Sequence, residues 1–544
     1  MQSKGITRCH WLSGAAIGAL LATIPAMAQN SVPAGAGETG LETVVVTAER
    51  RAENQQNVPV SVGVLSGDSL SRITSSGDDT LLALSGKVPG LYVESTTGRI
   101  FPRFYIRGLG NVDFYLGASQ PVSIIQDDIV LEHVVLKSNP VYDVGQIEVL
   151  RGPQGSLFGR NTTAGIIKFA TNRPTEDFEG RASASYGAYN SIDLDAGIGG
   201  PIIQDKLAFR ISGLYQHRDD YIDNTYTGAS ADGTKTGQKD ALGGFDERDL
   251  RLQFLLTPSA DFSILTSVHG RWYDGTSTVF RRGGITLGSH DVSGLDWDKT
   301  RYDEADNNPQ SYNTYGGSVN ASWKLGDVTL TSITGYESTS GFSRGDTDGG
   351  AAADYGNTGY GESMGRVRAL GQWTQEMRLS SADDARLKWQ VGGLYFDSRD
   401  KTEFYQRAWF LTGAAHNPNN WVRLHDVNTS WSLFGQASYQ LTDAFTVTAG
   451  ARVTEDSKET RLLKTADKVD GTVTYTGRRD VKMSDTRPSW DVSALYTINP
   501  DVNVYVRVAK GFRGPTIQGR SAVFNSDFTT AKSETILSWE AGLK

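Results

Sequence analysis

The chain has little of several residue types, and each shortage excludes a class of protein. Its 544 residues include one cysteine, Cys9, so no disulfide can form within the chain and a small disulfide-stapled domain is excluded. Lysine and arginine number 53 against 62 aspartates and glutamates, and the net charge of −9 excludes a protein that binds mainly nucleic-acid phosphates. No run after residue 30 approaches the ~18 apolar residues of a membrane-spanning helix.

Glycine and aromatic residues, in contrast, are abundant. There are 61 glycines but 16 prolines, and aromatic residues make up 10% of the chain. This combination suits many short strands and tight turns rather than a disordered chain. A helical membrane protein is excluded, but a transmembrane β-barrel is not, since its strands need only alternate between apolar and polar residues.

The first 28 residues have the pattern of a signal peptide. Lys4 and Arg8 give a basic start, a mostly apolar stretch covers residues 11–24, and Ala-Met-Ala at residues 26–28 supplies a small-x-small cleavage site. The alternative, a buried N-terminal helix, explains neither the charge nor the cleavage pattern. We expect cleavage after Ala28, which leaves a mature chain without cysteine.

From residue 180 onward the chain alternates between apolar and polar residues. Odd-numbered positions from Trp431 to Leu441 are mostly apolar and even-numbered ones mostly polar, and a similar alternation runs from Phe445 to Val453. Successive side chains of a strand point to opposite faces, so each segment would have one apolar and one polar face. Fourteen such strands are expected, near residues 180–188, 190–199, 206–217, 247–257, 261–272, 311–325, 327–337, 370–380, 386–397, 429–441, 443–455, 486–498, 501–511 and 533–544.

The links between these expected strands alternate in length. Short links such as 258–260 and 499–500 alternate with long ones such as 338–369 and 398–428. Short turns on one side and long loops on the other are typical of outer-membrane β-barrels. A soluble β-sandwich or propeller is the alternative, and it would need a much less polar inner face.

Residues 29–175 lack this regular pattern. Residues 42–50 form a β-branched run bounded by charges, which is either an exposed strand able to add to another protein's sheet or an edge strand of the following domain. Residues 80–85 predict a helix, and residues 123–125 and 146–150 predict short strands. The glycine-rich residues 151–161 lack the Gly-Lys-Ser/Thr ending of a phosphate loop, so we expect tight turns packed against a wall where no Cβ fits.

Several motifs together resemble those of the TonB-dependent outer-membrane receptors. They are ETVVVTAER (42–50), VPGLYVES (88–95), FYIRGLG (104–110), IEVLRGPQGSLFGRNTTAGIIKFATNRP (147–174), TQEMRLSS (374–381) and SWEAGLK (538–544). The resemblance implies a mixed α/β plug domain inside an antiparallel transmembrane β-barrel. The chain then divides into a signal peptide (1–28), a flexible leader with a TonB box (29–52), a plug domain (53–175) and a barrel (176–544).

The family resemblance implies 22 barrel strands, of which about 14 are present here. A barrel of fourteen strands would enclose roughly 10,000 Å³, whereas a plug of about 120 residues occupies about 16,000 Å³. We therefore expect the barrel to be C-terminally incomplete and the chain to be an N-terminal fragment of a longer receptor.

The resemblance also implies a function. The chain would be an active transporter of the Gram-negative outer membrane and not an enzyme, and TonB would deliver energy by strand addition to the TonB box, which comprises Glu42, Thr43, Val44, Val45, Val46, Thr47 and Ala48. A ferric siderophore is the expected ligand, with a glycan, cobalamin or heme as alternatives. A passive porin and a non-transporting surface receptor also remain open. Further partners would be outer-membrane lipid and the barrel-assembly machinery, with no nucleic acid and no cofactor.

Four charged residues are candidates for seating the plug. Arg107 and Arg151 lie in glycine-rich plug loops, and Glu376 and Glu540 fall on the polar phase of expected barrel strands. A carboxylate on the lipid side would be costly, so both glutamates should face the lumen. The resemblance implies that the four form one buried cluster; the alternative is that each meets only lumen water.

The expected long loops carry the candidate ligand contacts. We single out Trp409, Trp421, His416 and His425, whose rings suit a siderophore's catechol or a sugar ring equally well. The sequence shows no spacing typical of a nucleophile–base pair or of metal ligands.

Overall fold

The computed structural model describes residues 44–74, 80–111, 113, 115–230, 232–234, 238–282, 284, 288–292, 294–356, 360–408, 419–466, 475–524 and 526–544. The chain divides into a unit of residues 1–43 and a compact unit of residues 44–544. The expected signal peptide and four candidate site residues, Glu42, Thr43, Trp409 and His416, lie outside the described residues. Within the described part, no helix is both long and apolar enough to cross a membrane.

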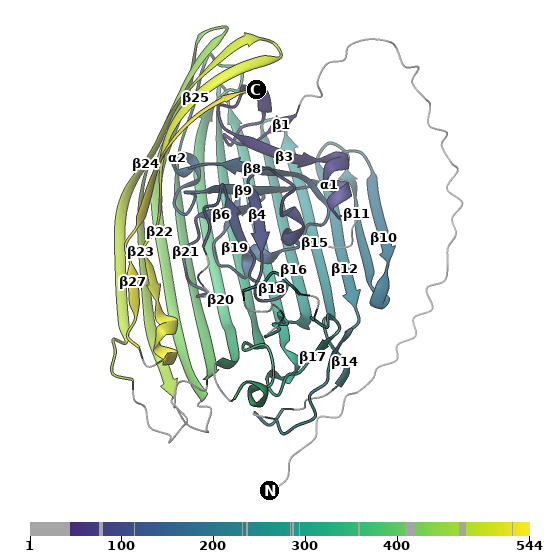
Figure 1. The fold of residues 1–544 in the computed structure, drawn as a ribbon. Coiled ribbons are helices and arrows are strands. Elements are labelled where there is room, and N and C mark those ends of the chain that lie inside the picture. The colour runs from purple at the N-terminus through teal and green to yellow at the C-terminus, as the bar shows by residue number, and fades with distance from the viewer. Residues whose placement is uncertain are drawn as a thin grey trace, which may run out of the picture. The chain divides into compact units, whose positions relative to one another are not determined.

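The largest element is one antiparallel sheet of fourteen strands (Figure 1). Each strand pairs with the next one in the order; Ala437 of the tenth strand, for example, lies opposite Ala449 of the eleventh. In sheet order the strands are β10 (Glu179–Tyr186), β11 (Ile192–Ile203), β12 (Leu207–Arg218), β15 (Phe245–Ser259), β16 (Phe262–Thr276), β18 (Pro309–Leu325), β19 (Val328–Asp346), β20 (Tyr360–Ser381), β21 (Leu387–Ala408), β22 (Asn419–Thr442), β23 (Phe445–Ala466), β24 (Asp480–Asn499), β25 (Val502–Arg513) and β28 (Glu534–Leu543).

All fourteen expected strands are confirmed, but several are longer than the sequence pattern indicated. β20 begins at Tyr360 rather than near residue 370, and β22 begins at Asn419 rather than near residue 429. The extra residues lie at the ends that lead into long loops. Where a strand extends beyond the membrane, both of its faces can be polar, so the alternation that marks the rest of the strand is lost.

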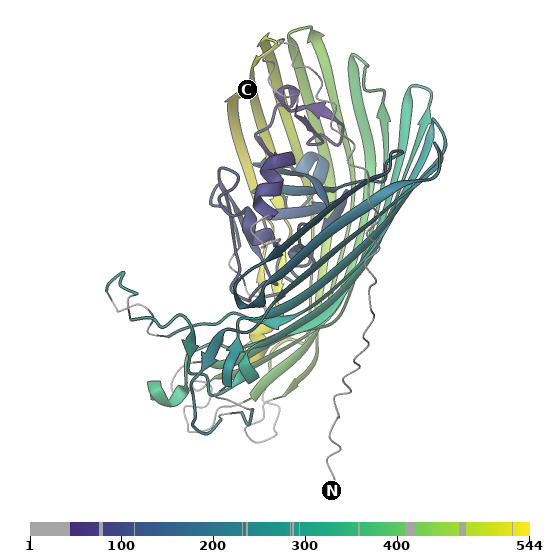
Figure 2. The same cartoon turned by 90° about the vertical axis from the view of Figure 1, so that its right-hand side faces the viewer.

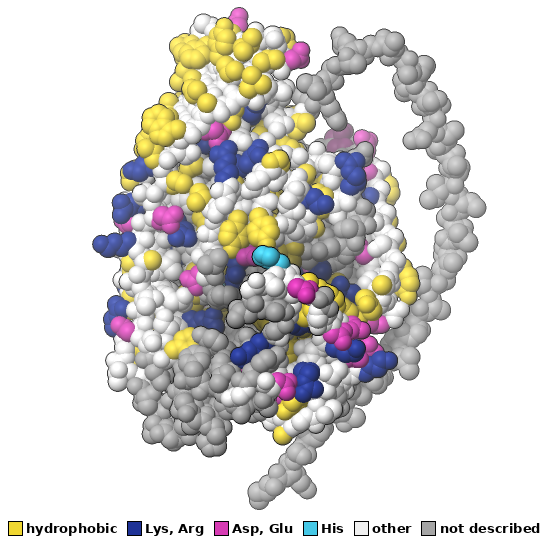
Figure 3. All heavy atoms as spheres, viewed as in Figure 1, with side chains coloured by type: hydrophobic (Ala, Val, Ile, Leu, Met, Phe, Trp, Pro, Cys, Tyr) yellow, Lys and Arg dark blue, Asp and Glu magenta, His cyan; other side chains and the backbone are white. Residues whose placement is uncertain are grey.

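The outer face of the sheet is apolar, as the alternation predicts. On β22, Leu433 is 64% exposed whereas its neighbour Phe434 is 5% exposed. Hydrophobic side chains gather on the surface over the C-terminal strands, at the top of the view in Figure 3. The large exposed ones on β24, β25 and β28 are Val492, Tyr496, Ile498, Val506, Leu537, Trp539 and Leu543. This face matches the lipid-facing band of a membrane barrel.

The sheet is curved but not closed. Among the described residues, β10 and β28 stand at its two edges and each has a single neighbouring strand. The two ribbon views show the N-terminal elements on the concave side of the sheet (Figures 1 and 2). An open sheet agrees with the expectation that fourteen strands do not enclose the plug.

The N-terminal elements form a mixed α/β plug. Its five-stranded sheet has the order β3 (Val62–Ser66), β8 (Val144–Arg151), β9 (Gly165–Thr171), β6 (Val122–Gln126) and β7 (Ile129–Leu131). A second sheet pairs β4 (Leu91–Glu94) with β5 (Arg103–Ile106), and the helices are α1 (Gly67–Thr74) and α2 (Gly155–Phe158). The helix expected at residues 80–85 is the 3₁₀ helix η2 (Leu81–Leu84), and the strands expected at 123–125 and 146–150 lie within β6 and β8.

Short elements complete the chain. They are the strands β1 (Val45–Val46), β2 (Glu53–Asn54), β13 (Ile222–Asn224), β14 (Gln238–Leu242), β17 (Lys299–Thr300), β26 (Thr516–Gln518) and β27 (Thr529–Ala531), and the 3₁₀ helices η1 (Gln55–Asn57), η3 (Leu136–Ser138), η4 (Ala188–Asn190), η5 (Ala305–Asn307), η6 (Ala352–Tyr355) and η8 (Gly519–Phe524).

The plug packs closely against the inner face of the sheet. One hydrophobic cluster joins plug residues such as Leu65 and Ile147 to Val422 and Leu424 of β22. At the start of α2, a Cβ on Gly155 would lie 2.7 Å from Ser489 Oγ on β24. At its end, Gly159 has φ +86° and a Cβ there would lie 2.8 Å from Arg452 Nη2. The glycine-rich turns therefore pack against the inner face of the fourteen-stranded sheet, where a Cβ would not fit, as expected.

Candidate functional site

The segment Val44–Ala48, which belongs to the candidate TonB box, is folded back on the plug. Within it, β1 pairs with β2, with Val45 opposite Asn54 and Val46 opposite Glu53. Val46 is fully buried, while Val45 is half exposed. The strand thus has a partner here, but that partner is β2 in a separate two-stranded sheet and not an edge of the plug sheet.

Two charged side chains of the plug sheet hold this segment. The backbone N–H and the hydroxyl of Thr47 both donate to Glu148 Oε1 on β8, each at 2.8 Å. Lys168 Nζ on β9 donates to Thr47 O at 2.9 Å and to Thr47 Oγ1 at 2.6 Å. Burial lowers the pKa of Lys168, against the opposing effect of the nearby carboxylates. The segment is thus tied to the two strands that carry the long plug motif.

Arg50 and Arg51, which lie shortly after this segment, connect it to the fourteen-stranded sheet. Arg50 Nη1 lies 2.6 Å from Glu376 Oε1 on β20, with side chains only 2% and 5% exposed. Arg51 Nη1 lies 2.8 Å from Asp383 Oδ1 in the short turn between β20 and β21. Short turns mark the periplasmic side of an outer-membrane barrel, so this is the end at which TonB would act. Neither arginine was singled out from the sequence as a contact to the sheet, although Arg50 ends the β-branched run 42–50 and Arg51 follows it.

The four candidate seating charges do not form one cluster. Glu540 accepts hydrogen bonds from Arg107 Nη1 at 2.9 Å and from Tyr505 O–H at 2.6 Å, whereas Glu376 pairs with Arg50. Arg151 Nη1 donates to Pro89 O at 2.9 Å, and its guanidinium is close enough to Glu540 and Arg107 to be affected by their charges, so only Glu376 lies apart from the other three. The expectation fails because β20 and β28 are six positions apart in the sheet, which the strand phase alone could not reveal.

A pocket lies between the plug and the wall, on the side of the long loops. Its cavity volume is about 40 Å³, and it is lined by plug residues 115–118, 132 and 133 and by residues of β21, β22 and β23. Tyr115 O–H donates to both carboxylate oxygens of Asp426 at 2.8 Å, and Lys458 Nζ donates to Ser119 Oγ. The pocket therefore offers a phenol, carboxylates and an amine, which suit a polar ligand.

Glu132 and His133 supply the plug's titratable groups in this pocket. Burial opposes ionisation of Glu132, but Arg160, whose Nη1 donates to it at 2.8 Å, outweighs burial and lowers the pKa of Glu132 to about 2. Burial lowers the pKa of His133 to about 4, so its imidazole is neutral at pH 7. His133 Nδ1 accepts from Val135 N–H, which assigns the ring proton to Nε2. That buried Nε2 has no hydrogen-bond partner among the described residues, so it is a donor available to a ligand.

The two described ligand candidates from the loops lie elsewhere. Val422 and Leu424 of β22 belong to the core shared with the plug, so the alternating Trp421 and His425 face the outside of the sheet. The ring of Trp421 packs against Arg423 and Lys464, and His425 Nδ1 lies 2.7 Å from Asp400 O. Neither residue lines the pocket.

Comparison with known families assigns the two parts of the chain separately. Residues 54–166 match the TonB-dependent Receptor Plug Domain, and residues 255–544 match the TonB dependent receptor-like β-barrel. The pesticin receptor of Yersinia pestis is 23% identical over 505 residues, which cover 92% of this chain and 66% of that protein. The ferric aerobactin receptor of Klebsiella pneumoniae is 26% identical over 227 residues, 40% of this chain and 29% of that protein.

The fold has a close counterpart among solved structures. The crystal structure of the ferric yersiniabactin uptake receptor FyuA from Yersinia pestis superposes with a TM-score of 0.73 at 19% identity, covering 89% of this chain and 69% of that one. The chain thus spans about two thirds of the length of the pesticin receptor and of FyuA. With both its plug and its barrel matched, the chain belongs to the family of TonB-dependent receptors of the outer membrane.

Proposed function

We propose that the chain acts in the energised uptake of a ferric siderophore across the outer membrane, with TonB gripping residues 42–48. One observation carries this proposal: both candidate sites are attached to the same plug sheet. Lys168 on β9 holds Thr47, and β9 pairs with β6, which pairs with β7. Glu132 and His133 of the pocket directly follow β7. Strands β9, β6 and β7 therefore connect residues 44–48, where TonB would bind, with the pocket, where the ligand would bind.

The contacts at residues 44–48 indicate how force would enter the plug. Thr47 is bonded to β8 and to β9, which are central strands of the plug sheet. Pulling on the segment would load these hydrogen bonds first and then the sheet itself, a local unit that can yield before the barrel does. Ligand in the pocket and TonB at the segment would thus be coupled through one element, as uptake requires.

The lining of the pocket and the similar proteins both support a ferric siderophore as the ligand. A ferric siderophore presents several oxygen atoms, and the pocket supplies donors from His133 and Lys458. Receptors for ferric aerobactin and ferric yersiniabactin are among the proteins that resemble the chain. A glycan, cobalamin or heme would be the alternative cargo.

Uptake of a ⁵⁵Fe-labelled siderophore panel, by cells expressing the protein from its own gene, tests the proposal. Deletion of residues 42–48 should abolish uptake and leave binding at the cell surface intact. Val45→Pro should do the same, because proline removes the backbone N–H that an added strand would use; Val45→Thr is the matched control. Uptake that survives the deletion would indicate a passive porin, and binding without uptake in the unaltered protein would indicate a non-transporting receptor.

Processing and assembly belong to the same proposal. Residues 1–28 would direct export and be removed after Ala28, and the barrel-assembly machinery would insert the sheet into outer-membrane lipid. N-terminal sequencing of the mature protein checks the cleavage site, and a mature chain that still contains Trp11 would contradict it.

A further inference from the structure

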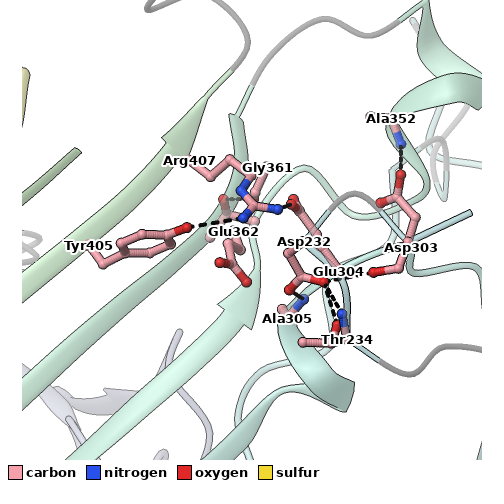
Figure 4. A network of polar contacts seen from close by, with 12 residues as sticks. Asp232, Thr234, Asp303, Glu304, Ala305, Ala352, Gly361, Glu362, Tyr405 and Arg407 are labelled. Carbon is pink, nitrogen blue, oxygen red and sulfur yellow. Dashed lines mark hydrogen bonds and ion pairs between the residues drawn. The ribbon is translucent and has the colours of Figure 1, made fainter. Parts of the chain in front are cut away.

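A group of carboxylates lies at the loop end of the sheet, away from the plug and its pocket. Asp303 and Glu304 precede η5, and Asp346 ends β19 (Figure 4 shows the first two). The three side chains are buried, at 4%, 2% and 0% exposure. One oxygen from each lies within 4.8 Å of the others. The tertiary structure thus brings together negative charges that are 42 or 43 positions apart in sequence.

Two of these carboxylates have an oxygen that no N–H or O–H group of the described residues satisfies, and Asp346 also faces the carboxyl group of Asp348. Asp303 Oδ2 accepts from Ala352 N–H at 3.3 Å, and Asp346 Oδ1 accepts from Gly349 N–H at 2.8 Å. Their other oxygens, Asp303 Oδ1 and Asp346 Oδ2, are buried and have no hydrogen-bond partner among the described residues. A buried carboxylate oxygen without a donor or cation is costly, so these two atoms point to a missing positive group.

Two arginines lie near this group of carboxylates. Arg344 Nη2 lies 2.5 Å from Asp232 and 2.6 Å from Glu362, which are outside the group. Arg407 contacts Glu304 of the group at 3.4 Å and also donates to Tyr405 Oη (Figure 4). The two unsatisfied oxygens belong to the other two carboxylates, Asp303 and Asp346.

We propose that Asp303, Glu304 and Asp346 bind a calcium ion. Calcium takes oxygen ligands at about 2.3–2.6 Å, so ligand oxygens on opposite sides of the ion lie at most about 5 Å apart, as the three oxygens here do. Magnesium demands near-ideal octahedral geometry and zinc prefers nitrogen and sulfur, so an irregular all-carboxylate site favours calcium. Water would complete the coordination.

The ion would add a link between loops that are already in contact, since Asp346 N–H donates to Asn308 Oδ1 at 3.0 Å and Ala305 N–H donates to Asp232 Oδ2 at 3.0 Å. Its ligands come from the approach to η5 and from the end of β19, and Asp303 also accepts from the backbone of η6. Calcium would therefore fasten the loops around β18 and β19 to each other at the outer end of the sheet. This inference does not depend on transport, and it can hold or fail whatever the ligand of the pocket is.

Calcium binding to the purified, detergent-solubilised protein tests the inference. After treatment with EGTA, isothermal titration with CaCl₂ should show one site with a Kd of about 0.1–1 mM, the range of extracellular calcium modules. Asp303→Asn and Asp346→Asn should each weaken binding at least ~10-fold. Asp306→Asn is the matched control, because Asp306 is exposed in the same loop and its φ of 48° suits asparagine. Equal affinity in all three variants would overturn the inference.

A second measurement decides the case if the two variants fail to fold. Terbium replaces calcium in oxygen sites, and its luminescence can be excited through a nearby tyrosine; Tyr302, next to Asp303, is fully buried. The unaltered protein should give a terbium signal that CaCl₂ displaces and that MgCl₂ displaces at least ~10-fold less well. No signal, or no calcium bound at about 5 mM, would overturn the inference without any variant.

Discussion

Buried carboxylates occur at both ends of the sheet, but their hydrogen-bond and ion-pair partners differ between the two ends. At the short-turn end, Glu376 has Arg50 and Arg378 at 2.6 and 2.9 Å, and Glu540 has Arg107 at 2.9 Å. At the loop end, Asp303 and Asp346 keep buried oxygens without any donor among the described residues. The plug thus brings its own cations to the wall at one end, whereas the loops leave negative charge for a cation from outside.

The difference separates two uses of the same chemistry. A carboxylate paired within the chain holds two elements together at all times, and removal of its partner strands a buried charge. A carboxylate left unpaired makes the local structure depend on the surroundings. Substitutions of the charged residues test this difference between paired and unpaired carboxylates.

Arg50→Ala should destabilise the plug most, by about 3 kcal/mol, because it removes one of the two cations from a nearly fully buried Glu376. Pulse proteolysis in urea would measure the loss. Asp383→Ala is the matched control: it removes the ion pair of Arg51, and because Asp383 is 83% exposed that loss should stay below about 1 kcal/mol. Equal effects would mean that burial does not distinguish the two pairs.

Glu148→Ala should release residues 44–48, because the backbone N–H of Thr47 loses its acceptor at a cost of about 1–3 kcal/mol. Trypsin should then cut faster at Arg50 and Arg51. Glu94→Ala is the control, since Glu94 also accepts a hydrogen bond, from Tyr105 O–H, at a different place in the plug. Unchanged cleavage after Glu148→Ala would show that other contacts hold the segment.

Acidification should weaken the plug through His133. Its pKa is lowered to about 4 in the fold, chiefly by burial and also by Lys137, while nearby Glu132 opposes the shift. The unfolded chain therefore binds more protons between pH 6.5 and 4, so stability is complete above pH 6.5 and falls as the pH drops toward 4, by up to about 1 kcal/mol per pH unit. Urea midpoints measured across this range should vary less with pH in His133→Gln, and an identical pH profile would contradict the assignment.

The Arg107–Glu540 pair should show the smallest effect, a coupling energy below about 1 kcal/mol, because the Arg107 side chain is 43% exposed. A double-mutant cycle with Arg107→Ala and Glu540→Gln measures it. The parallel cycle with Arg151→Ala should give a smaller coupling, since Arg151 donates to Pro89 O. A larger coupling energy for Arg151 would mean that Arg151, and not Arg107, is the main partner of Glu540.

The strands could be predicted from the sequence because their pattern is local. Lipid outside and plug or water inside impose alternation on each strand separately, and Leu433 and Phe434 already differ in phase as neighbours. The pattern ends where the membrane ends, which is why the starts of β20 and β22 were placed about ten residues too late. The same limit put Trp421 and His425 among loop residues, although they belong to the outer face of a strand.

Local sequence patterns thus predict the plug, the fourteen strands, their apolar and polar faces, and the family. Which charges meet depends on how distant segments pack together. Arg50 and Glu376 are 326 positions apart, and Thr47 and Glu148 are 101 apart, so their contacts depend on how the plug seats in the sheet. Asp303 and Asp346 come together only because β18 and β19 bring the approach to η5 beside the end of β19. Periodicity reports the environment of one strand, whereas a pair or a site requires the strand order, and no short stretch of residues contains that order.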